Sequence, residues 1–285
     1  MYTIPPKKMV IINILDILKK YTDMDHRLTQ AEIVDILKKE YYMEVDRKTV
    51  KRNLLNLLDL NCGIDYTEVT RTDKQGNDTS ICTDWYITRE FDDSELRLLI
   101  DSVIFSKTIP QKQCQDLVKK IKSLSNVYFD KKVGNIYSLP EIRPENKELF
   151  YTIDILDEAI SKGKKVSFVY NSYGTDKKLH PKREGKYIVN PYRMAATNGR
   201  YYLICNYDKY DTLSNYRIDR ITGIKMLDEN RKPVRELKEK EINLPKHMAE
   251  HLYMFAGESI RVKFKAKNYI IDQIIDWFGF GPKIT

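Results

Sequence analysis

The sequence has no apolar run that approaches the roughly 20 residues needed to cross a bilayer as a helix. Its first eight residues, Met1 to Lys8, lead into a helical pattern and lack the cleavage pattern of a signal peptide. Cysteine is scarce as well, with four scattered residues and no Cys-x-x-Cys pair. These absences argue against a membrane protein and against a secreted disulfide scaffold. We therefore expect a cytoplasmic protein with four reduced thiols.

Catalytic motifs are also missing. The chain has no P-loop, no Rossmann glycine pattern and no Gly-x-Ser-x-Gly elbow. One stretch, His247-x-x-Glu250-His251, matches the inverted zinc-protease pattern. A catalytic zinc site needs a third protein ligand, and the nearest following carboxylate, Glu258, lies beyond Gly257. We expect no enzyme, no cofactor and no metal, and interpret the two histidines as a surface pair on a linker helix.

The charge is unevenly distributed along the chain. The 285 residues carry a net charge of +8, with 42% hydrophobic and 32% charged residues, as in ordinary globular proteins of two or three domains. Residues 1–90 hold 14 Lys and Arg against 15 Asp and Glu, whereas residues 159–226 hold 14 against five. This excess favours an anionic ligand in the second region, with a solvated basic surface as the alternative.

The pattern of residues 1–90 predicts three helices followed by a β-hairpin. Ile11, Ile14, Leu15 and Leu18 form an apolar helical stripe. Thr29 and Glu32 form a capping box for a second helix, and Asp46 caps a third. The core face of the third helix comprises Val50, Leu54, Leu57 and Leu58. Two strand-like runs, from Asp65 to Thr72 and through Trp85 to Ile87, then complete the order of a winged helix-turn-helix.

The polar face of the third helix suggests DNA binding. Lysine and arginine suit phosphates, while threonine and asparagine can also reach base edges in a major groove. The candidates are Arg47, Lys48, Thr49, Lys51, Arg52 and Asn56, with Lys74 in the wing. A solvated amphipathic face is the alternative. Because this segment has slightly more acids than bases, binding would depend on a local patch.

Residues 91–147 read as a helical connector. Asp92 to Glu95 cap one helix, and Pro110 precedes another. A connector of this kind suits dimerisation or signal relay, and both remain open. A further helix is expected from Leu149 to Ile160, ending near Gly163.

From Lys164 the hydrophobic period changes to two. Val166, Phe168 and Tyr170 define one strand, and Tyr187 to Ala196 a second. Asn198-Gly199 is a strong signal for a tight turn before the next strand. Several short strands at this spacing predict a small antiparallel barrel over residues 148–230.

Particular motifs in this region resemble the WYL domain. Arg200 to Leu203 is similar to the signature of that family, and Tyr216 to Ile221 to its partner motif. The segments around His180-Pro181 and Asn190 to Arg193 occupy the places of its intervening strands. Farther upstream, the recognition helix from Arg47 to Leu54 and the connector from Asp93 to Leu99 also resemble these regulators. The family consists largely of bacterial transcription regulators with an Sm/SH3-like barrel that is thought to sense nucleotides or nucleic-acid fragments.

The resemblance implies an effector site made of aromatic and arginine side chains. The candidates are Tyr170, Arg193, Tyr201, Tyr202, Arg217 and Arg220. Alternation along the strands does not put all six on one face. For each tyrosine, core packing is an equal alternative, and Asp219 could be an internal partner of Arg220. Tyr201 stands at the position where the family name expects tryptophan, which keeps a stacking face.

The remaining residues predict a linker helix over 231–257, and residues 258–285 resemble the start of the C-terminal extension found in this family. A strand from Arg261 to Lys265 followed by a helix fits the opening of that extension, which is too short to bury a core of its own. The predicted fold class is thus an α+β multidomain chain. It comprises the winged helix-turn-helix, the helical connector, the small antiparallel barrel and a partial α/β extension.

Two functions fit these observations. The first is a homodimeric transcription regulator that binds duplex DNA and senses an anionic nucleotide or nucleic-acid effector. The alternative is an accessory protein of a phage-defence or CRISPR system, whose barrel binds single-stranded nucleic acid. They differ in which domain dominates the affinity for nucleic acid.

Overall fold

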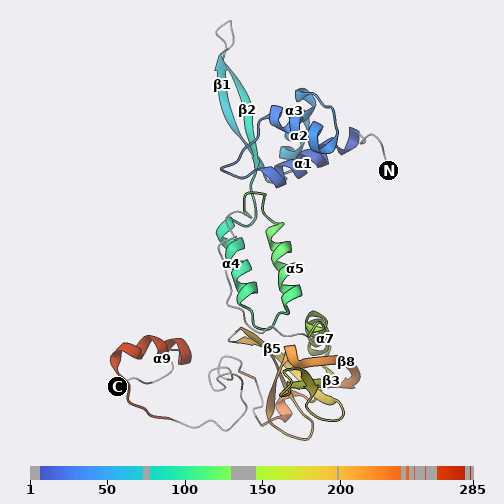
Figure 1. Cartoon of the computed structure of the whole chain (residues 1–285), viewed down its shortest axis with the longest axis vertical. Helices are drawn as coiled ribbons and strands as arrows, with labels where there is room; N and C mark the ends of the chain where they lie inside the picture. Colours follow the sequence, from blue (N-terminus) through green and yellow to red (C-terminus); the bar gives the residue numbers. More distant parts are fainter. Residues whose placement is uncertain are drawn as a thin grey trace. The chain divides into compact units, whose positions relative to one another are not determined.

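The fold is described from a computed structural model of the chain (Figure 1). The described residues are 7–72, 78–129, 146–197, 199–238, 242–243, 247, 254, 262–279 and 283. The chain divides into two compact units, the first with residues 1–105 and 114–139 and the second with residues 106–113 and 140–285. Within the described ranges, no helix combines the length and the apolar character required to span a membrane.

The first unit opens with three helices and a hairpin, in the order that the sequence predicts. They are α1 (Val10–Tyr21), α2 (Gln30–Tyr41), α3 (Arg47–Asp59), β1 (Ile64–Thr72) and β2 (Asp78–Ile87). The predicted caps are confirmed. The Thr29 hydroxyl accepts from the Glu32 amide at 3.3 Å while the Glu32 carboxylate accepts from the Thr29 amide at 2.7 Å. The Asp46 carboxylate accepts from the Thr49 amide at 2.8 Å, which starts α3.

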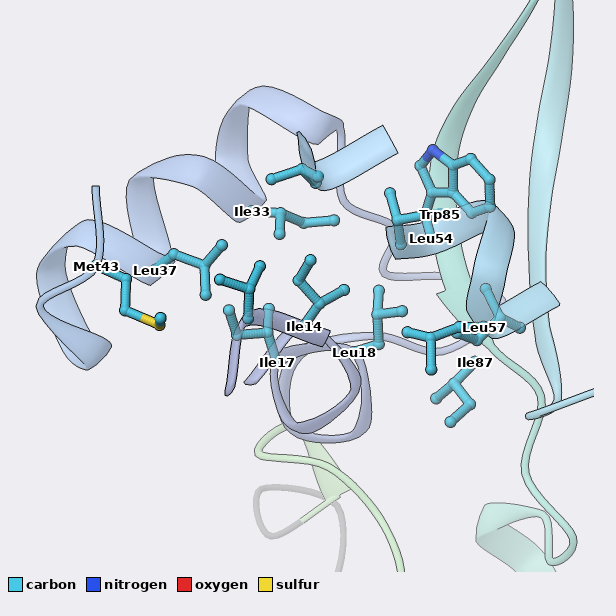
Figure 2. Packing of buried hydrophobic residues seen from close by; sticks show 13 residues of the cluster. Ile14, Ile17, Leu18, Ile33, Leu37, Met43, Leu54, Leu57, Trp85 and Ile87 are labelled. Carbon is cyan, nitrogen blue, oxygen red and sulfur yellow. The ribbon is translucent and has the colours of Figure 1, made fainter. Parts of the chain in front are cut away.

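A single hydrophobic core holds these elements together (Figure 2). Ile14, Ile17 and Leu18 of α1 meet Ile33 and Leu37 of α2. Leu54 and Leu57 bring in α3, while Trp85 and Ile87 bring in β2. Because α3 packs through Val50, Leu54 and Leu57, its polar face is directed toward solvent. Leu58, which the sequence also predicts for the core face, is only partly buried and lies outside the cluster.

A helical hairpin follows in the same unit. It consists of α4 (Asp93–Phe105) and α5 (Gln111–Lys122), as the capping and apolar patterns predict. The Asp92 carboxylate accepts from the Glu95 amide at 2.8 Å, and the Glu95 carboxylate accepts from the Asp92 amide at 2.9 Å. Leu96, Ile100 and Phe129 form its buried cluster.

The loop after α5, residues 123–129, is hydrogen-bonded to the C-terminal end of α1. The last carbonyls of a helix have no partner within the helix. Here the Val127 amide donates to the Lys20 carbonyl at 3.1 Å, and the Asn126 amide group donates to the Asp23 carboxylate at 2.6 Å. Arg89 adds donors to the Lys19 carbonyl at 2.6 Å and the Leu124 carbonyl at 3.2 Å. We call this set of contacts the α1 clasp.

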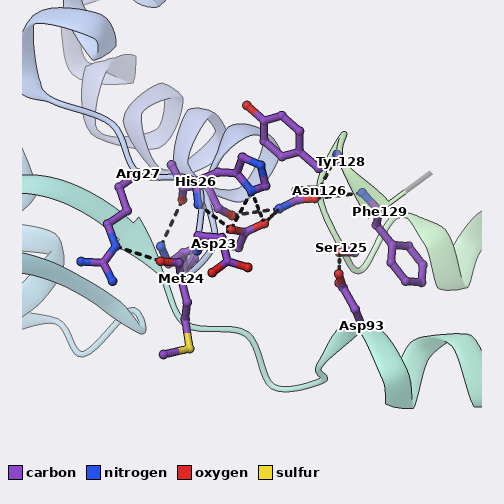
Figure 3. Close-up of polar contacts among 12 residues, drawn as sticks. Asp23, Met24, His26, Arg27, Asp93, Ser125, Asn126, Tyr128 and Phe129 are labelled. Atoms are coloured by element: carbon purple, nitrogen blue, oxygen red, sulfur yellow. Dashed lines mark hydrogen bonds and ion pairs between the residues drawn. The ribbon is translucent and has the colours of Figure 1, made fainter. Parts of the chain in front are cut away.

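His26 completes the α1 clasp (Figure 3). Its ring stacks on Tyr128 with centroids 3.7 Å apart, and its Nδ1 lies 2.9 Å from the Asp23 carboxylate. Burial by itself raises the pKa of the Asp23 carboxyl, but hydrogen bonds from Asn126 and His26 outweigh it and hold the pKa below its usual value. The ionised form of Asp23 therefore contributes to the stability of this unit.

The second unit consists of a helix and a curled antiparallel sheet, confirming the expected α+β fold class. Its elements are α7 (Leu149–Lys162), β3 (Lys164–Tyr173), β4 (Leu179–Pro181), β5 (Tyr187–Thr197), β6 (Arg200–Asn206), β7 (Leu213–Arg217) and β8 (Ile221–Asn230). The strand order is β4-β3-β5-β6-β7, and β8 pairs with β3, so that the sheet curls into a half-barrel. Gly163 ends α7 with a left-handed backbone at φ 64°, as predicted.

The motif from Tyr216 to Ile221 does not form one continuous strand. The ladder ends at Arg217, and the 3-10 turn η2 (Ile218–Arg220) leads into β8. The buried amide group of Asn146 donates to the carbonyls of Asp219 at 3.1 Å and Ile221 at 2.7 Å. These carbonyls therefore need no ladder partner, and the chain can turn at this point.

The C-terminal predictions are met in part. Residues 231–257 contribute the 3-10 turn η3 (Val234–Glu236), and most of the predicted linker helix lies outside the described residues. Residues 262–265 belong to no strand, contrary to the prediction, because no neighbouring chain in the described ranges pairs with them. The expected helix follows as α9 (Ile271–Phe278), after the 3-10 turn η5 (Asn268–Ile270).

Leu54→Ala is expected to destabilise the first unit by about 2–5 kcal/mol, because it leaves a cavity among α1, α2 and the wing. Leu60→Ala is the matched control, since that leucine is 68% exposed just after the same helix. Urea unfolding monitored by circular dichroism measures both. Equal effects of the two substitutions would contradict the packing described above.

Asp23→Asn is expected to lower the free energy of unfolding at neutral pH. The folded-state pKa of Asp23 is lowered, so its contribution is present above the unfolded pKa of about 3.9 and is lost as pH falls through the folded pKa. The difference between wild type and variant should therefore shrink in acid. Urea unfolding between about pH 7 and about pH 3 tests this, with the exposed Asp25→Asn as control. A difference that stays constant with pH would contradict it.

Candidate functional site

The polar face of α3 carries an exposed cationic surface. Val50, Leu54 and Leu57 point into the core. The exposed residues on the helix are Arg47, Lys48, Lys51, Arg52 and Asn56, with Asp59 as its last residue. The sequence-predicted DNA-binding residues therefore share one helix face, apart from Thr49 and Lys74.

No ion pair within the described ranges includes the four cations of this face, which we call the α3 cations. Neighbouring lysines differ, since Lys20 pairs with Glu40 at 2.8 Å and Lys38 with Glu44 at 3.5 Å. Unpaired cations on a rigid helix can bind phosphate groups without first breaking an internal contact.

Thr49 has a structural role that the helix pattern does not reveal. Its hydroxyl donates to the Asp46 carboxylate at 3.2 Å, and its amide donates to the same carboxylate. The amide hydrogen bond of Thr49 is the main cause that lowers the pKa of the Asp46 carboxyl. Thr49 thus starts the helix that presents the α3 cations.

The wing is a long two-stranded ladder whose register runs from Ile64 opposite Ile87 to Thr72 opposite Asp78. Residues 73–77, which include the predicted phosphate contact Lys74, lie outside the described residues.

In the second unit, Arg217 forms a buried ion pair with Asp219. The Arg217 Nε and Nη2 atoms donate to the Asp219 carboxylate at 3.0 and 2.6 Å. Burial of the guanidinium lowers its pKa, but the hydrogen bonds and charge of Asp219 outweigh burial and raise it. The alternative pairing of Asp219 with Arg220 does not form in the described chain, because Asp219 pairs with Arg217 instead.

Arg220 packs beside Tyr173, with its guanidinium carbon 5.9 Å from the ring centroid. Its Nε is buried and has no hydrogen-bond partner in the described part of the chain. Two of the three predicted effector arginines thus differ in charge pairing: Arg217 is neutralised, whereas Arg220 keeps an unsatisfied donor.

The strand register divides the other predicted effector residues between two faces. Tyr202 lies opposite Arg217, and Arg193 opposite Ile204, so Tyr202, Arg217 and Arg193 share one face of the β5-β6-β7 ladder. On that face Tyr202 is buried in a cluster with Tyr192 and Leu213, while Arg193 is exposed. Tyr201 lies on the opposite face and is exposed. One surface made of all six predicted residues therefore does not form.

Tyr170 belongs to the core of the second unit. Its ring centroid lies 4.9 Å from that of Tyr216, and its hydroxyl accepts from the Arg217 amide at 3.3 Å. Burial is the main cause that raises the pKa of the Tyr170 hydroxyl. Tyr170 thus supports the motif residues Tyr216 and Arg217 from inside the sheet.

One exposed arginine escaped the sequence prediction. Arg183, between β4 and β5, stacks on Tyr187 with its guanidinium carbon 3.7 Å from the ring centroid. The only sequence signal for it was the excess of basic residues over 159–226. The sequence does not tell which of those cations stacks on an aromatic ring, because stacking depends on tertiary contacts.

The possible metal motif gains no support from the described residues, where no group of His, Cys, Asp and Glu side chains could hold a metal ion. His247 Nε2 lies 3.2 Å from the Asn215 amide oxygen. Glu250, His251 and Glu258 lie outside the described residues.

Asp219→Ala is expected to destabilise the second unit by about 3 kcal/mol, because it leaves the partly buried Arg217 guanidinium without its counter-charge. Asp211→Ala is the matched control. It removes an exposed carboxylate that pairs with Lys232, and should cost about 1 kcal/mol or less. Urea unfolding of the two variants measures the difference, and a loss of similar size in both would argue against the buried pair.

Comparison with known proteins identifies the second unit. Residues 151–226 match the model of the WYL domain, which runs from α7 to β8. No curated protein matches the chain. Among solved structures, proteasome accessory factor B/C (PafBC) of Arthrobacter aurescens is similar at 13% identity and a TM-score of 0.26. The alignment covers 81% of this chain and 35% of that one, so this chain spans about a third of the length of its relative. At this level the likeness carries no functional inference. The domain match, together with the half-barrel and its motif strands, identifies residues 151–226 of this chain as a WYL domain.

Proposed function

We propose that this protein is a transcription regulator that binds duplex DNA through α3 and senses an anionic nucleotide or nucleic-acid effector through its WYL domain. It acts in the cytoplasm as a homodimer, and the proposal assigns it no catalytic role. Two-fold symmetry would match a palindromic operator, whose half-sites are read by two copies of the same helix.

The α3 cations carry this proposal. They are exposed and without internal ion pairs in the described ranges, and they lie on one face of a helix that is fixed by its cap and its core. Phosphate contacts from such a face would set the register on the duplex. Asn56 is also exposed, about two helical turns after Lys48, and could contribute base contacts.

The effector half of the proposal rests on the charge of the WYL domain and on its family. Arg193, Tyr201 and Arg220 keep exposed or unsatisfied groups. Tyr170, Tyr202 and Arg217 are engaged within the domain, so a ligand that reached Arg217 would compete with Asp219. An effector regulates such a protein only if it binds two arrangements of the dimer with different affinity.

Lys48→Ala combined with Arg52→Ala is expected to abolish the enrichment of specific duplex sites, because it removes two of the α3 cations. The measurement is selection from fragmented genomic DNA by the purified full chain at about 150 mM salt, where charge attraction over distance is screened. The double variant Lys38→Ala/Lys39→Ala is the control, since it removes two exposed lysines from the neighbouring helix α2.

Retention of enriched sites by the Lys48/Arg52 variant would overturn the assignment of α3. Failure of the wild type to enrich any duplex, together with tight binding of single strands, would favour the alternative role as a single-stranded nucleic-acid accessory protein. In that case substitutions in the WYL domain should dominate the loss of affinity, and those in α3 should have little effect.

A further inference from the structure

A shallow depression of about 470 Å³ lies between β3 and the loop that connects β4 to β5. It is lined by Val169, Pro181, Arg183, Glu184, Gly185 and Lys186. None of these is among the effector residues that the motifs predict. The volume is within the range of about 300–1,000 Å³ that is typical of small-molecule sites.

Arg183 is held in place on a rigid aromatic support. Tyr187 packs with Phe168 and Tyr216, at centroid distances of 5.8 and 5.5 Å, so the ring beneath Arg183 is anchored in the core. The guanidinium carbon lies 3.7 Å from that ring, and Nη2 donates to the Lys186 carbonyl at 2.9 Å. An arginine fixed in this way loses little conformational entropy when it binds a ligand.

The two cations of this depression differ in charge pairing from Arg217 and Lys165 of the same domain. Arg217 is neutralised by Asp219, and Lys165 by Asp208 and Glu229. None of the ion pairs within the described ranges includes Arg183 or Lys186. A guanidinium has five N–H donors, and those of Arg183 that are not used by the Lys186 carbonyl or the Tyr207 hydroxyl can bind a ligand. An anion could bind here without displacing an internal carboxylate.

We propose that this depression binds the phosphate of a nucleoside monophosphate group, which is a free mononucleotide or the 5′-terminal nucleotide of a single strand. Arg183 and Lys186 would bind the phosphate, since a guanidinium and an ammonium side by side form charge-assisted hydrogen bonds with it. Val169 and Pro181 offer an apolar surface to the sugar or base, and the Glu184 carboxylate can accept from a hydroxyl or amino group. The inference rests on the proposed function only in taking a nucleotide as the effector.

The test is isothermal titration calorimetry of the full chain at about 150 mM salt. The probes are adenosine 5′-monophosphate, adenosine, and a thymidine tetranucleotide with and without a 5′-phosphate. The test variant is Arg183→Ala/Lys186→Ala. The control, Lys177→Ala/Lys178→Ala, removes two exposed lysines from the adjacent turn between β3 and β4. Thermal unfolding checks that each variant folds, and Arg183→Lys keeps the charge while removing the planar stacking group.

The expected result is binding that needs the phosphate and weakens about tenfold to a hundredfold in the Arg183/Lys186 variant, but less than about twofold in the control. Arg183→Lys should give an intermediate loss. The two phosphate-bearing probes then tell which source of the nucleotide the site accepts. Equal losses in both double variants would overturn the site in favour of diffuse attraction, as would a wild type that binds neither phosphate-bearing probe.

The duplex selection with the α3 variant uses none of these probes, so the two proposals fail separately. Nucleotide binding through Arg183 without any duplex enrichment would refute the regulator and leave the site standing. Duplex enrichment without nucleotide binding would refute the nucleotide site and leave the regulator standing.

Discussion

The ion pair between Arg217 and Asp219 holds the WYL domain at the point where its strand path turns. Asp219 is almost fully buried, and a carboxylate in that position is stable only with a cation beside it. Asn146 fixes the backbone of the same turn through two carbonyls. The turn leads directly into β8, which pairs with β3 along one side of the sheet. Because Asp219 neutralises Arg217, the capacity of the domain to bind anions depends on its other cations.

The same rule of charge pairing applies in the first unit. Lys20 and Lys38 form ion pairs with glutamates, whereas the α3 cations form none in the described ranges. The core and the Asp46 cap hold the helix, so no ion pair on its polar face is needed for stability. Stability and binding thus use opposite faces of one helix. In the α1 clasp, hydrogen bonds made by Asn126, Val127 and Arg89 connect the loop after α5 to the C-terminal end of α1.

Prediction from the sequence was most reliable where the determining contacts are local. Thr29 with Glu32, Asp46 with Thr49, and Asp92 with Glu95 each lie three residues apart, so their spacing alone marks the start of a helix. The strand predicted over Arg261–Lys265 rested on the likeness to the family's C-terminal extension. Its described residues, 262–265, do not form a strand, because a strand also needs a neighbour to pair with. For the candidate site, the face of α3 could be derived from the 3.6-residue period. The site in the WYL domain could not, since a list of aromatic and basic residues contains no information on their pairing.

The sequence by itself determined the order of elements, the caps, the apolar faces of the helices and the motifs of the WYL domain. These depend on residues close in the chain and on the period of hydrophobic positions. Only the tertiary structure decided that Asp219 neutralises Arg217, that Tyr202 shares a face with Arg193, and that Arg183 stacks on Tyr187. Strand register and side-chain pairing arise from contacts between distant segments, whose geometry is set by packing of the whole domain.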